Sequence, residues 1–371
     1  MLFTVNSQDL LDGLRTVTRA LSARPAKQIL EGVLIDAEDD HITLTCSDGT
    51  LTIEHVITAS VEENGRVVLP GKLFTDLCAR LPGGNVTIQV KDGRSASIKC
   101  GSSRSNMSCM NAMEYPEMNE ITTGYPVELP QNKLRDMISH VVFSIATDES
   151  RQILTGCLLE LSATETRMVA LDGFRLAMQK LDKGNELPEG KELMRFVLPG
   201  RVMNELSKIL ADSEEPCGLL MAKNQVQATF GSTRLSSVLL AGEFIDYRKI
   251  LPTAFKTTAS VDRATVQNAI DRASLMAMAG KNNLIRMSFK EGSLSITSNA
   301  DLGDVLEEMD AQLDGDPISI SFNAKYITDV IRNMSDERLF MCFNSAVSPC
   351  VIQPEEGDSY LYLILPVRTF Q

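Results

Sequence analysis

The cysteine and histidine residues of this chain, the side chains most often used for metal binding and nucleophilic catalysis, are scattered along it. The 371 residues include eight cysteines and three histidines, and no Cys-x-x-Cys pair occurs. Zinc needs clustered ligands, and His41, His55 and His140 do not stand at a recognised metal-binding spacing from any cysteine. We therefore expect buried free thiols in a reducing compartment, and neither a metal nor another cofactor.

The motifs of common enzyme classes do not occur in the sequence. There is no Gly-x-x-x-x-Gly-Lys-Ser/Thr phosphate loop and no Gly-x-Ser-x-Gly nucleophile turn. The glycine-rich segment 81–85 is typical of a turn. The sequence therefore favours a binding protein over an enzyme.

The lysines and arginines could bind phosphate groups, although the net charge of −13 argues against a nucleic-acid partner. Six segments with helical periodicity carry 12 basic and 9 acidic residues, whereas the rest of the chain carries 24 basic and 40 acidic residues. One interpretation is that these are ordinary solvated helix faces. The other is that the six helices line one surface, which would then bind phosphates without reading bases.

One motif recurs three times and reveals how these elements are organised. A short strand leads into an amphipathic helix, with a proline or asparagine between them, at 67–74, 196–203 and, more loosely, 318–326. The motifs start 129 and then 122 residues apart, which is too long for a solenoid repeat. We therefore expect three copies of a whole domain.

Each copy is predicted to contain two amphipathic helices beside several antiparallel strands, an α+β fold. The predicted first helices span 7–21, 130–144 and 262–278, and the second helices span 70–81, 199–212 and 323–334. The predicted strands after the first helices span 29–35, 153–159 and 284–289. Similar linkers at 114–117 and 246–252 predict domains at 1–122, 123–254 and 255–371.

The opening sequence has no basic segment followed by an apolar stretch, and no apolar run approaches the ~20 residues needed to cross a bilayer. We expect a cytoplasmic protein.

Several segments are similar to those of one known family. They are the opening Phe-Thr-Val at 3–5, Ala-Arg-Pro followed by Ile-Leu within 23–30, Leu-Asp-Gly-Phe-Arg-Leu at 171–176, Asp-Tyr-Arg-Lys-Ile-Leu-Pro at 246–252, Phe-Asn-Ala-Lys-Tyr at 322–326 and Leu-Pro-Val-Arg at 365–368. Together with the threefold repeat, they resemble the bacterial DNA polymerase III beta subunits, which are sliding clamps. The resemblance covers the whole chain in register.

The resemblance implies a homodimer closed head to tail into a ring of six domains, with twelve helices around duplex DNA. It also implies a groove between the second and third domains where the replicative polymerase, the clamp loader, repair polymerases and other proteins dock a short linear motif. The groove positions are Leu154, Leu171, Gly173, Phe174, Arg175, Leu176, Ile245, Lys249, Ile250, Asn323, Tyr326, Val347, Pro349, Leu363, Ile364, Leu365, Pro366, Val367 and Arg368. Phe174 and Lys249 depart from the commonest family residues, and for any single apolar member core packing is an equal alternative.

The resemblance also implies positions for DNA contact and for ring closure. The DNA-contacting positions are Arg24, Lys72, Arg80, Arg151 and Arg201. At the dimer interface it places Arg104 and Met107 on one side and Leu275 and Met276 on the other, with Asp301 and Asp304 near Arg104. Ser105 stands where the family often has an aromatic residue, which removes apolar area from this interface.

The expected function is therefore a processivity clamp with no chemistry of its own. A closed ring stays on DNA topologically, and a tethered polymerase rebinds because linkage raises its effective concentration. The alternative is a protein-interaction scaffold that never surrounds DNA.

Overall fold

The computed structural model describes residues 1–22, 24–116, 121–279 and 283–368, so Ala23 of the family-like segment lies outside the described residues. The described part contains six α-helices, two for each predicted domain. They are α1 (Ser7–Val17), α2 (Gly71–Cys78), α3 (Gln131–Val142), α4 (Gly200–Ile209), α5 (Arg263–Ala279) and α6 (Ala324–Arg332). The six predicted helices are confirmed, although most end earlier than their apolar periodicity suggested.

Short 3₁₀ helices supplement these elements. They are η1 (Thr18–Ala20), η2 (Gln28–Glu31), η3 (Ala112–Glu114), η4 (Glu149–Thr155) and η5 (Tyr247–Ile250). No helix of the described segments is long and apolar enough to cross a membrane.

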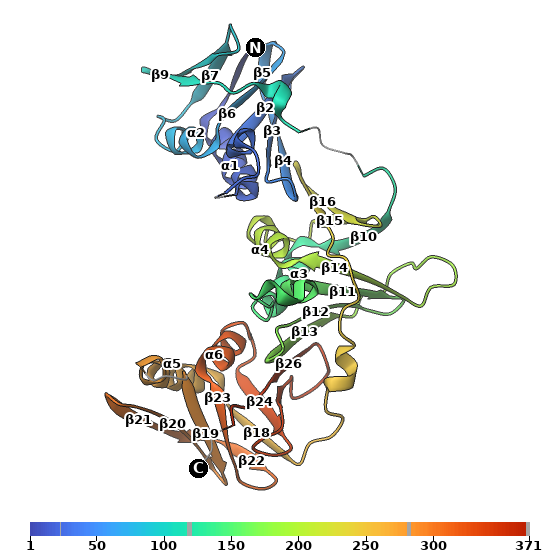
Figure 1. Ribbon diagram of the computed structural model, residues 1–371, viewed down its shortest axis with the longest axis vertical. Helices are drawn as coiled ribbons and strands as arrows, with labels where there is room; N and C mark the ends of the chain where they lie inside the picture. Colours follow the sequence, from blue (N-terminus) through green and yellow to red (C-terminus); the bar gives the residue numbers. More distant parts are fainter. Residues whose placement is uncertain (23, 117–120, 280–282, 369–371) are drawn as a thin grey trace. The chain divides into compact units, whose positions relative to one another are not determined.

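The chain divides into two compact units, residues 1–135 with 205–239 and residues 136–204 with 240–371 (Figure 1). The first unit contains two antiparallel sheets. One has the strand order β5 (Ser60–Glu63), β1 (Leu2–Asn6), β7 (Asn85–Val90), β8 (Ser95–Cys100) and β9 (Ser103–Ser108). The other has the order β10 (Tyr125–Pro130), β15 (Pro216–Met221), β16 (Gln225–Phe230), β17 (Thr233–Val238), β4 (Leu51–Thr58), β3 (His41–Ser47), β2 (Gly32–Glu38) and β6 (Gly65–Pro70).

The second unit also contains two antiparallel sheets. The larger has the order β14 (Leu193–Pro199), β11 (Gly156–Ser162), β12 (Thr166–Leu171), β13 (Arg175–Leu181), β26 (Tyr360–Ile364), β25 (Cys350–Ile352), β24 (Arg338–Phe343), β18 (Thr257–Asp262) and β22 (Gln312–Asp314). The smaller has the order β21 (Gly303–Asp310), β20 (Ser293–Ala300), β19 (Leu284–Lys290) and β23 (Ile318–Asn323).

The long sheets run without a break from one domain repeat into the next. In the first unit, β17 of the second repeat pairs with β4 of the first repeat. In the second unit, β26 of the third repeat pairs with β13 of the second repeat. The domains are therefore joined edge to edge by backbone hydrogen bonds, which the sequence did not predict.

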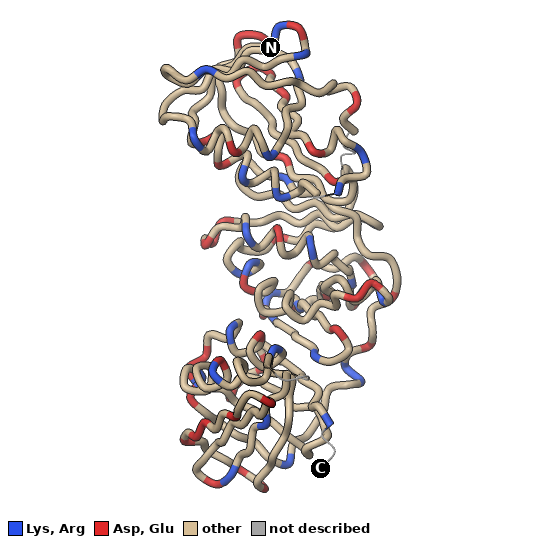
Figure 2. The backbone as a smooth tube through the Cα atoms, turned by 60° about the vertical axis from the view of Figure 1, so that its left-hand side comes forward, with Lys and Arg blue, Asp and Glu red and all other residues tan. Residues whose placement is uncertain are grey.

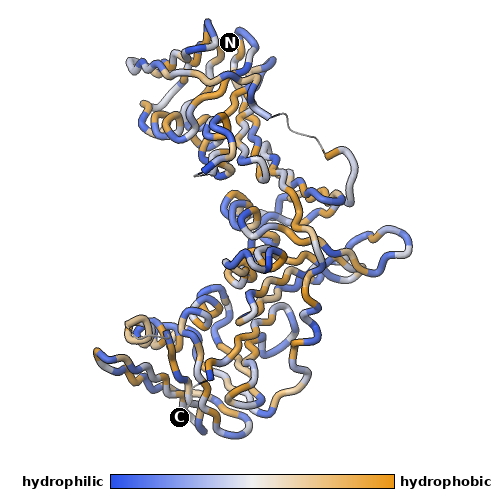
Figure 3. Tube along the Cα trace, viewed as in Figure 1, coloured by the Kyte–Doolittle hydropathy of each residue, from blue (hydrophilic) through white to orange (hydrophobic). Residues whose placement is uncertain are grey.

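The helices form and pack for local reasons that recur in the repeats. The side chain of Asn6 caps α1 by accepting a hydrogen bond from the backbone N–H of Gln8 at 2.8 Å, and Asn323 accepts one from the N–H of Lys325 at 3.0 Å. Helix α1 packs on β3 and β4 beside α2, and α5 packs on β19, β20 and β21 beside α6. Hydrophobic and hydrophilic residues alternate along strands such as β8 and β19, so each of these strands has one face in a core (Figure 3).

Two predicted strands, 29–35 and 153–159, begin too early, because their first residues lie in η2 and η4. Strands β2 and β11 begin instead at Gly32 and Gly156. At Gly32 a Cβ atom would approach a side-chain carbon of Val68 to 2.2 Å, and at Gly156 it would approach the carbonyl oxygen of Leu198 to 2.5 Å. A glycine is therefore required where the 3₁₀ turn passes into the strand.

Candidate functional site

Arg175 is the centre of a cluster in the second unit that joins the second domain repeat to the third. The residue is 6% exposed, and its guanidinium donates to Asp172 at 3.1 Å, to Asp329 on α6 at 2.6 Å and to the backbone carbonyl of Phe143 at 2.5 Å. Its guanidinium carbon also lies 4.6 Å from the centre of the Tyr326 ring. Charge-assisted hydrogen bonds and a cation–π contact thus hold this arginine in one position.

An aromatic pair covers one side of this cluster. The rings of Phe174 and Tyr326 stack with their centres 6.1 Å apart, and Phe174 is 58% exposed. The carbonyl of Phe174 accepts a hydrogen bond from the N–H of Leu365 at 2.9 Å, and the N–H of Val367 donates to the carbonyl of Ser321 at 2.8 Å. Burial and the carboxylate of Asp172 raise the pKa of the Tyr326 hydroxyl, which keeps it protonated.

The other predicted groove residues divide into a buried set and a surface set. The buried set, part of the core or of the sheet beneath it, consists of Leu154, Leu171, Leu176, Leu363 and Ile364. The exposed set consists of Gly173, Ile245, Lys249, Ile250, Val347, Leu365 and Arg368, while Asn323, Pro349, Pro366 and Val367 are half-buried. The structure thus brings Phe174, Arg175, Tyr326 and Leu365 together directly, and places Ile245 and Val347 on other loops, and Ile250 at the end of η5, in the same unit.

A buried carboxylate fixes the linker between the second and third repeats. Glu160 on β11 is 1% exposed and accepts hydrogen bonds from Arg195 at 2.9 Å, from Arg248 at 2.6 and 3.1 Å and from the Tyr247 hydroxyl at 2.8 Å. Burial alone would raise the pKa of Glu160, but the hydrogen bonds from Arg248 and Tyr247 and the nearby guanidiniums outweigh it and lower the pKa. The linker that carries Lys249 and Ile250 is therefore anchored to the sheet.

The Glu160→Gln variant should be less stable than the wild type by about 1–3 kcal/mol at pH 7, because two guanidiniums lose their charged acceptor. The folded-state pKa of Glu160 is lowered, so its contribution is present above the unfolded-state pKa and is lost as the pH falls through the folded-state value. Urea unfolding at pH 7 and near pH 3 measures this difference. It should shrink at the lower pH, and an equal difference at both values would contradict the assignment. The exposed Glu189→Gln variant is the control and should match the wild type.

The predicted DNA-contacting residues Arg24, Lys72, Arg80, Arg151 and Arg201 are all exposed. Figure 2 shows lysines and arginines along the helices, with acidic residues beside them. Many of these helical cations are already paired with carboxylates, which the sequence did not predict. Arg15, Arg19, Arg80, Arg135, Lys208, Arg272, Lys325 and Arg332 each lie within 4.0 Å of an acidic oxygen. Lys72 has no such ion pair within the described residues.

The residues predicted at the dimer interface lie on one edge strand and on one helix that packs beside another edge strand. Arg104 and Met107 belong to β9, the edge strand of its sheet, where Arg104 is exposed and Met107 is 8% exposed. Leu275 and Met276 belong to α5, which packs beside β21, the edge strand of another sheet. Leu275 is 63% exposed, so an apolar side chain of this helix faces solvent in the single chain.

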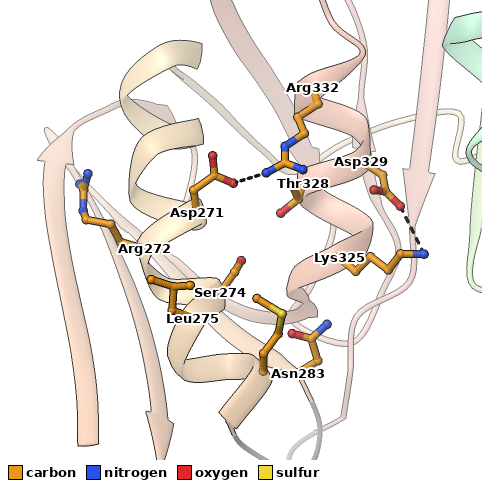
Figure 4. Close-up of a pocket in the computed structure, with 10 residues that line it drawn as sticks. Asp271, Arg272, Ser274, Leu275, Asn283, Lys325, Thr328, Asp329 and Arg332 are labelled. Carbon is orange, nitrogen blue, oxygen red and sulfur yellow. Dashed lines mark hydrogen bonds and ion pairs between the residues drawn. The ribbon is translucent and has the colours of Figure 1, made fainter.

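A cavity of about 690 Å³ lies between α5 and α6 (Figure 4). Its walls carry two ion pairs, Asp271 with Arg332 at 2.9 Å and Lys325 with Asp329 at 3.9 Å. Arg272, also in the lining, pairs with Glu307 at 2.6 Å. The side-chain oxygens of Ser274, Thr328 and Asn283 are buried without a hydrogen-bond partner among the described residues. The paired charges leave no surplus charge to select an ion, and the oxygens are placed to bind water.

Sequence reasoning missed the residues that position Arg175. Asp172 is predicted only as part of an Asp-Gly turn, and Asp329, three residues after Tyr326 on α6, belongs to no motif of the sequence. The link between Arg175 and Asp329 spans 154 residues, and no pattern in a single sequence indicates it.

The fold and these contacts define a class of protein. Repeated domains joined edge to edge present exposed cations and an ordered aromatic surface. All eight cysteines are free, and only Cys109 is not fully buried. This is a modular binding protein.

The whole chain is similar to one protein family. Family models for the N-terminal, central and C-terminal domains of the DNA polymerase III beta subunit match residues 1–119, 128–246 and 248–368. The beta sliding clamps of Staphylococcus aureus and Staphylococcus epidermidis are 32% identical over 380 residues, with full coverage of both chains. Among solved structures, the Bacillus subtilis sliding clamp (32% identity, TM-score 0.93) and the Thermotoga maritima beta subunit (27%, TM-score 0.92) are similar over the full length of both chains.

The chain therefore belongs to the DNA polymerase III beta subunit family, the sliding clamps. It is a DNA sliding clamp that gives replication its processivity and performs no catalysis, and DNA and a DNA polymerase are its partners.

Proposed function

We propose that two copies of this chain close head to tail into a ring of six domains that surrounds duplex DNA. The observation that carries this proposal is the pair of internal junctions, β17 with β4 and β26 with β13. The strand equivalent to β17 and β26 in the first domain is β9, and the strand equivalent to β4 and β13 in the third domain is β21. Both β9 and β21 are edge strands without such a partner in the described chain.

The two internal junctions share one register, and this supports a specific pairing between copies. In each domain, one strand leads directly into the first helix, and this gives a common starting position. Following the paired strands from there across the sheet places Arg104, Arg234 and Leu361 at equivalent positions. Following the paired strands in the same way from the strand that leads into the second helix of each domain places Glu54, Met178 and Leu306 at equivalent positions. Arg234 pairs with Glu54, and Leu361 pairs with Met178.

The same register therefore pairs Arg104 of one copy with Leu306 of the other, and Ser105 with Val305. We call this contact between β9 and β21 of two copies the seam. Unpaired edges readily pair with another chain, so closing both seams removes two exposed edges from each copy. The predicted interface residues Arg104, Met107, Leu275 and Met276 lie on or beside these two edges.

Contact with DNA in this proposal is electrostatic and independent of sequence. Arg24, Lys72, Arg80, Arg151 and Arg201 are exposed and supply cations for phosphate groups, as a sliding protein requires. The acidic remainder of the chain disfavours binding of DNA elsewhere on the protein.

Replacing Lys72, Arg80 and Arg201 with alanine should weaken DNA binding at low salt and flatten its salt dependence. The logarithmic slope should fall by about 0.9 for each lost phosphate contact. Fluorescence anisotropy with a short duplex at several salt concentrations measures this slope. An unchanged slope would show that these residues do not touch phosphate. The matched control removes Lys183, Lys191 and Lys290, which lie outside the six helices, and should leave the slope intact.

The partner groove is formed by the surface around Phe174, Arg175, Tyr326 and Leu365, together with the other residues that the resemblance implies. The exposed aromatic and aliphatic side chains suit the apolar anchors of a linear motif, and the buried Arg175 holds Tyr326 and Asp329 in place beneath them. We assign this groove to the replicative polymerase, the clamp loader, repair polymerases and other motif-bearing proteins. Domain boundaries near residues 122 and 254 and a cytoplasmic location belong to the same proposal, which the linker composition and the family membership support.

A further inference from the structure

The internal junctions do more than pair strands, and their side-chain contacts provide a template for the seam. At the junction between the second and third repeats, Phe174 in the turn before β13 stacks on Tyr326, the third residue of α6. Beside this stack, Arg175 donates to Asp329 of the same helix. The turn of one domain therefore rests on the second helix of the next.

The equivalent residues at the seam follow from the strand registers. The turn before β21 carries Leu302 at the position of Phe174, because Met178 and Leu306 are equivalent and each lies four residues further on. The third residue of α2 is Leu73, at the position of Tyr326, because Pro70 and Asn323 end equivalent strands. Leu73 is 59% exposed and Leu302 is 84% exposed in the single chain.

We propose that Leu73 of one copy packs against Leu302 of the other, and that this apolar contact, with Leu275 beside it, holds the seam closed. The inference rests on the proposed ring and names contacts that the family resemblance did not indicate. It commits to a second copy of this chain as the partner, because the same two positions are in contact within the chain at the junction of the second and third repeats.

The seam also lacks the charged contact that holds each internal junction. At the first junction Arg19 donates to Glu205 of α4 at 3.2 Å, and at the second Arg175 donates to Asp329 of α6 at 2.6 Å. Glu205 and Asp329 occupy the same position of the second helix, where α2 has Asp76.

The residues of the third repeat equivalent to Arg19 and Arg175 are Leu275 and Gly303, neither of which can donate to Asp76. Asp76 instead lies 3.9 Å from Arg80, which follows the end of the same helix. At the seam, one arginine donor is therefore replaced by a leucine and the other by a glycine, which has no side chain. Leu73, Leu302 and Leu275 provide the closing contacts instead. The seam therefore depends on strand pairing and apolar contacts, whereas each internal junction adds a charged contact.

Ser105 is a second place where the seam lacks a side-chain contact of an internal junction. At the second junction Phe143 packs on Tyr362 of β26, with ring centres 5.8 Å apart. The equivalent residues at the seam are Leu275 and Ser105, so the aromatic half of this contact is missing. The Leu73–Leu302 contact supplies apolar area in its place.

Disulfide trapping tests the contact directly. The Leu73→Cys, Leu302→Cys double variant should form covalent dimers on mild oxidation, seen by non-reducing electrophoresis, whereas each single variant should stay monomeric in the gel. The matched control pairs Leu302→Cys with Met113→Cys, since Met113 is 90% exposed but belongs to no equivalent contact. Efficient trapping in the control but not in the Leu73 pair would overturn the proposal.

A second pair separates failure of this contact from failure of the ring. The Ser105→Cys, Val305→Cys variant reports only on strand pairing at the seam. If it is trapped as a dimer while Leu73 and Leu302 are not, the ring stands and the apolar contact is wrong. If neither pair is trapped and the wild-type protein has the mass of a monomer, the proposed ring fails as well.

Charge substitution gives an independent readout in solution. Leu73→Asp should raise the dimer dissociation constant at least tenfold, and adding Leu302→Lys should recover most of the loss. Both side chains are exposed, so the fold should be unaffected, and the melting temperature checks this. Recovery with Leu302→Lys is the result that a merely local disturbance of α2 cannot produce, and its absence counts against the contact.

Discussion

Replacing Leu275 and Met276 with aspartate is expected to convert the dimer into monomers. Leu275 is 63% exposed in the single chain, and both residues lie on α5 beside the free edge of β21. In the proposed ring they are covered by β9 of the second copy. Two carboxylates there would be desolvated without a partner, on the helix face that packs against β21 and its Glu307.

The dimer dissociation constant should rise by about 100-fold or more, since each 1.4 kcal/mol of lost binding free energy is a factor of ten. Light scattering across a dilution series gives the mass directly. The core face of α5, formed by Val266, Ala269 and Ile270, is untouched, so the melting temperature should stay close to that of the wild type. A dimer that persists at all concentrations would place the interface elsewhere. Ile250→Asp, which changes an exposed apolar residue outside the seam, should remain dimeric.

Replacing Arg175 with alanine is expected to abolish most of the affinity for a linear-motif peptide. The guanidinium is held by Asp172, Asp329 and the carbonyl of Phe143, and it supports the ring of Tyr326. Its loss leaves the carboxylates of Asp172 and Asp329 without their shared cation. It also removes the guanidinium that packs against the Tyr326 ring of the aromatic pair. The peptide should lose the ordered surface for its apolar anchors, a decrease in affinity of tenfold or more.

Isothermal titration calorimetry with a motif-bearing peptide taken from a replicative polymerase measures this loss of affinity. Arg234→Ala is the matched control, because Arg234 pairs with Glu54 at 2.8 Å across the junction of the first and second repeats, in the first unit, whereas the groove residues belong to the second unit. That variant should lose stability and keep its peptide affinity. If Arg175→Ala bound the peptide as tightly as the wild type, the groove would not include this cluster.

The repeat could be predicted from the sequence because it depends on local signals. Helix periodicity, the Asp-Gly turns and a capping residue such as Asn323 act within a few residues of themselves, and the six helices followed from them. The starts of β2 and β11 could not be predicted in the same way. Their apolar residues Ile29 and Ile153 look like strand residues, and only the close approach of a neighbouring strand requires the glycine bend.

The junctions between domains could not be predicted because edge strands carry no distinct sequence pattern. Strand β4 pairs with β17 on its outer side, yet its alternation resembles that of any half-buried strand. The Arg175–Asp329 contact likewise depends on the two domains already being joined. Once the junctions are seen, however, the repeat itself allows the third one, the seam, to be derived residue by residue.

The central claim is topological, namely that this protein stays on DNA by surrounding it. The direct measurement loads the dimer onto nicked circular DNA with a clamp loader, removes free protein by gel filtration, and compares retention before and after the DNA is linearised by a restriction enzyme. The ring predicts high retention on the circle and rapid loss from the cut ends. Equal retention on circular and linear DNA would contradict it, and would mean that the protein holds DNA through its surface contacts alone.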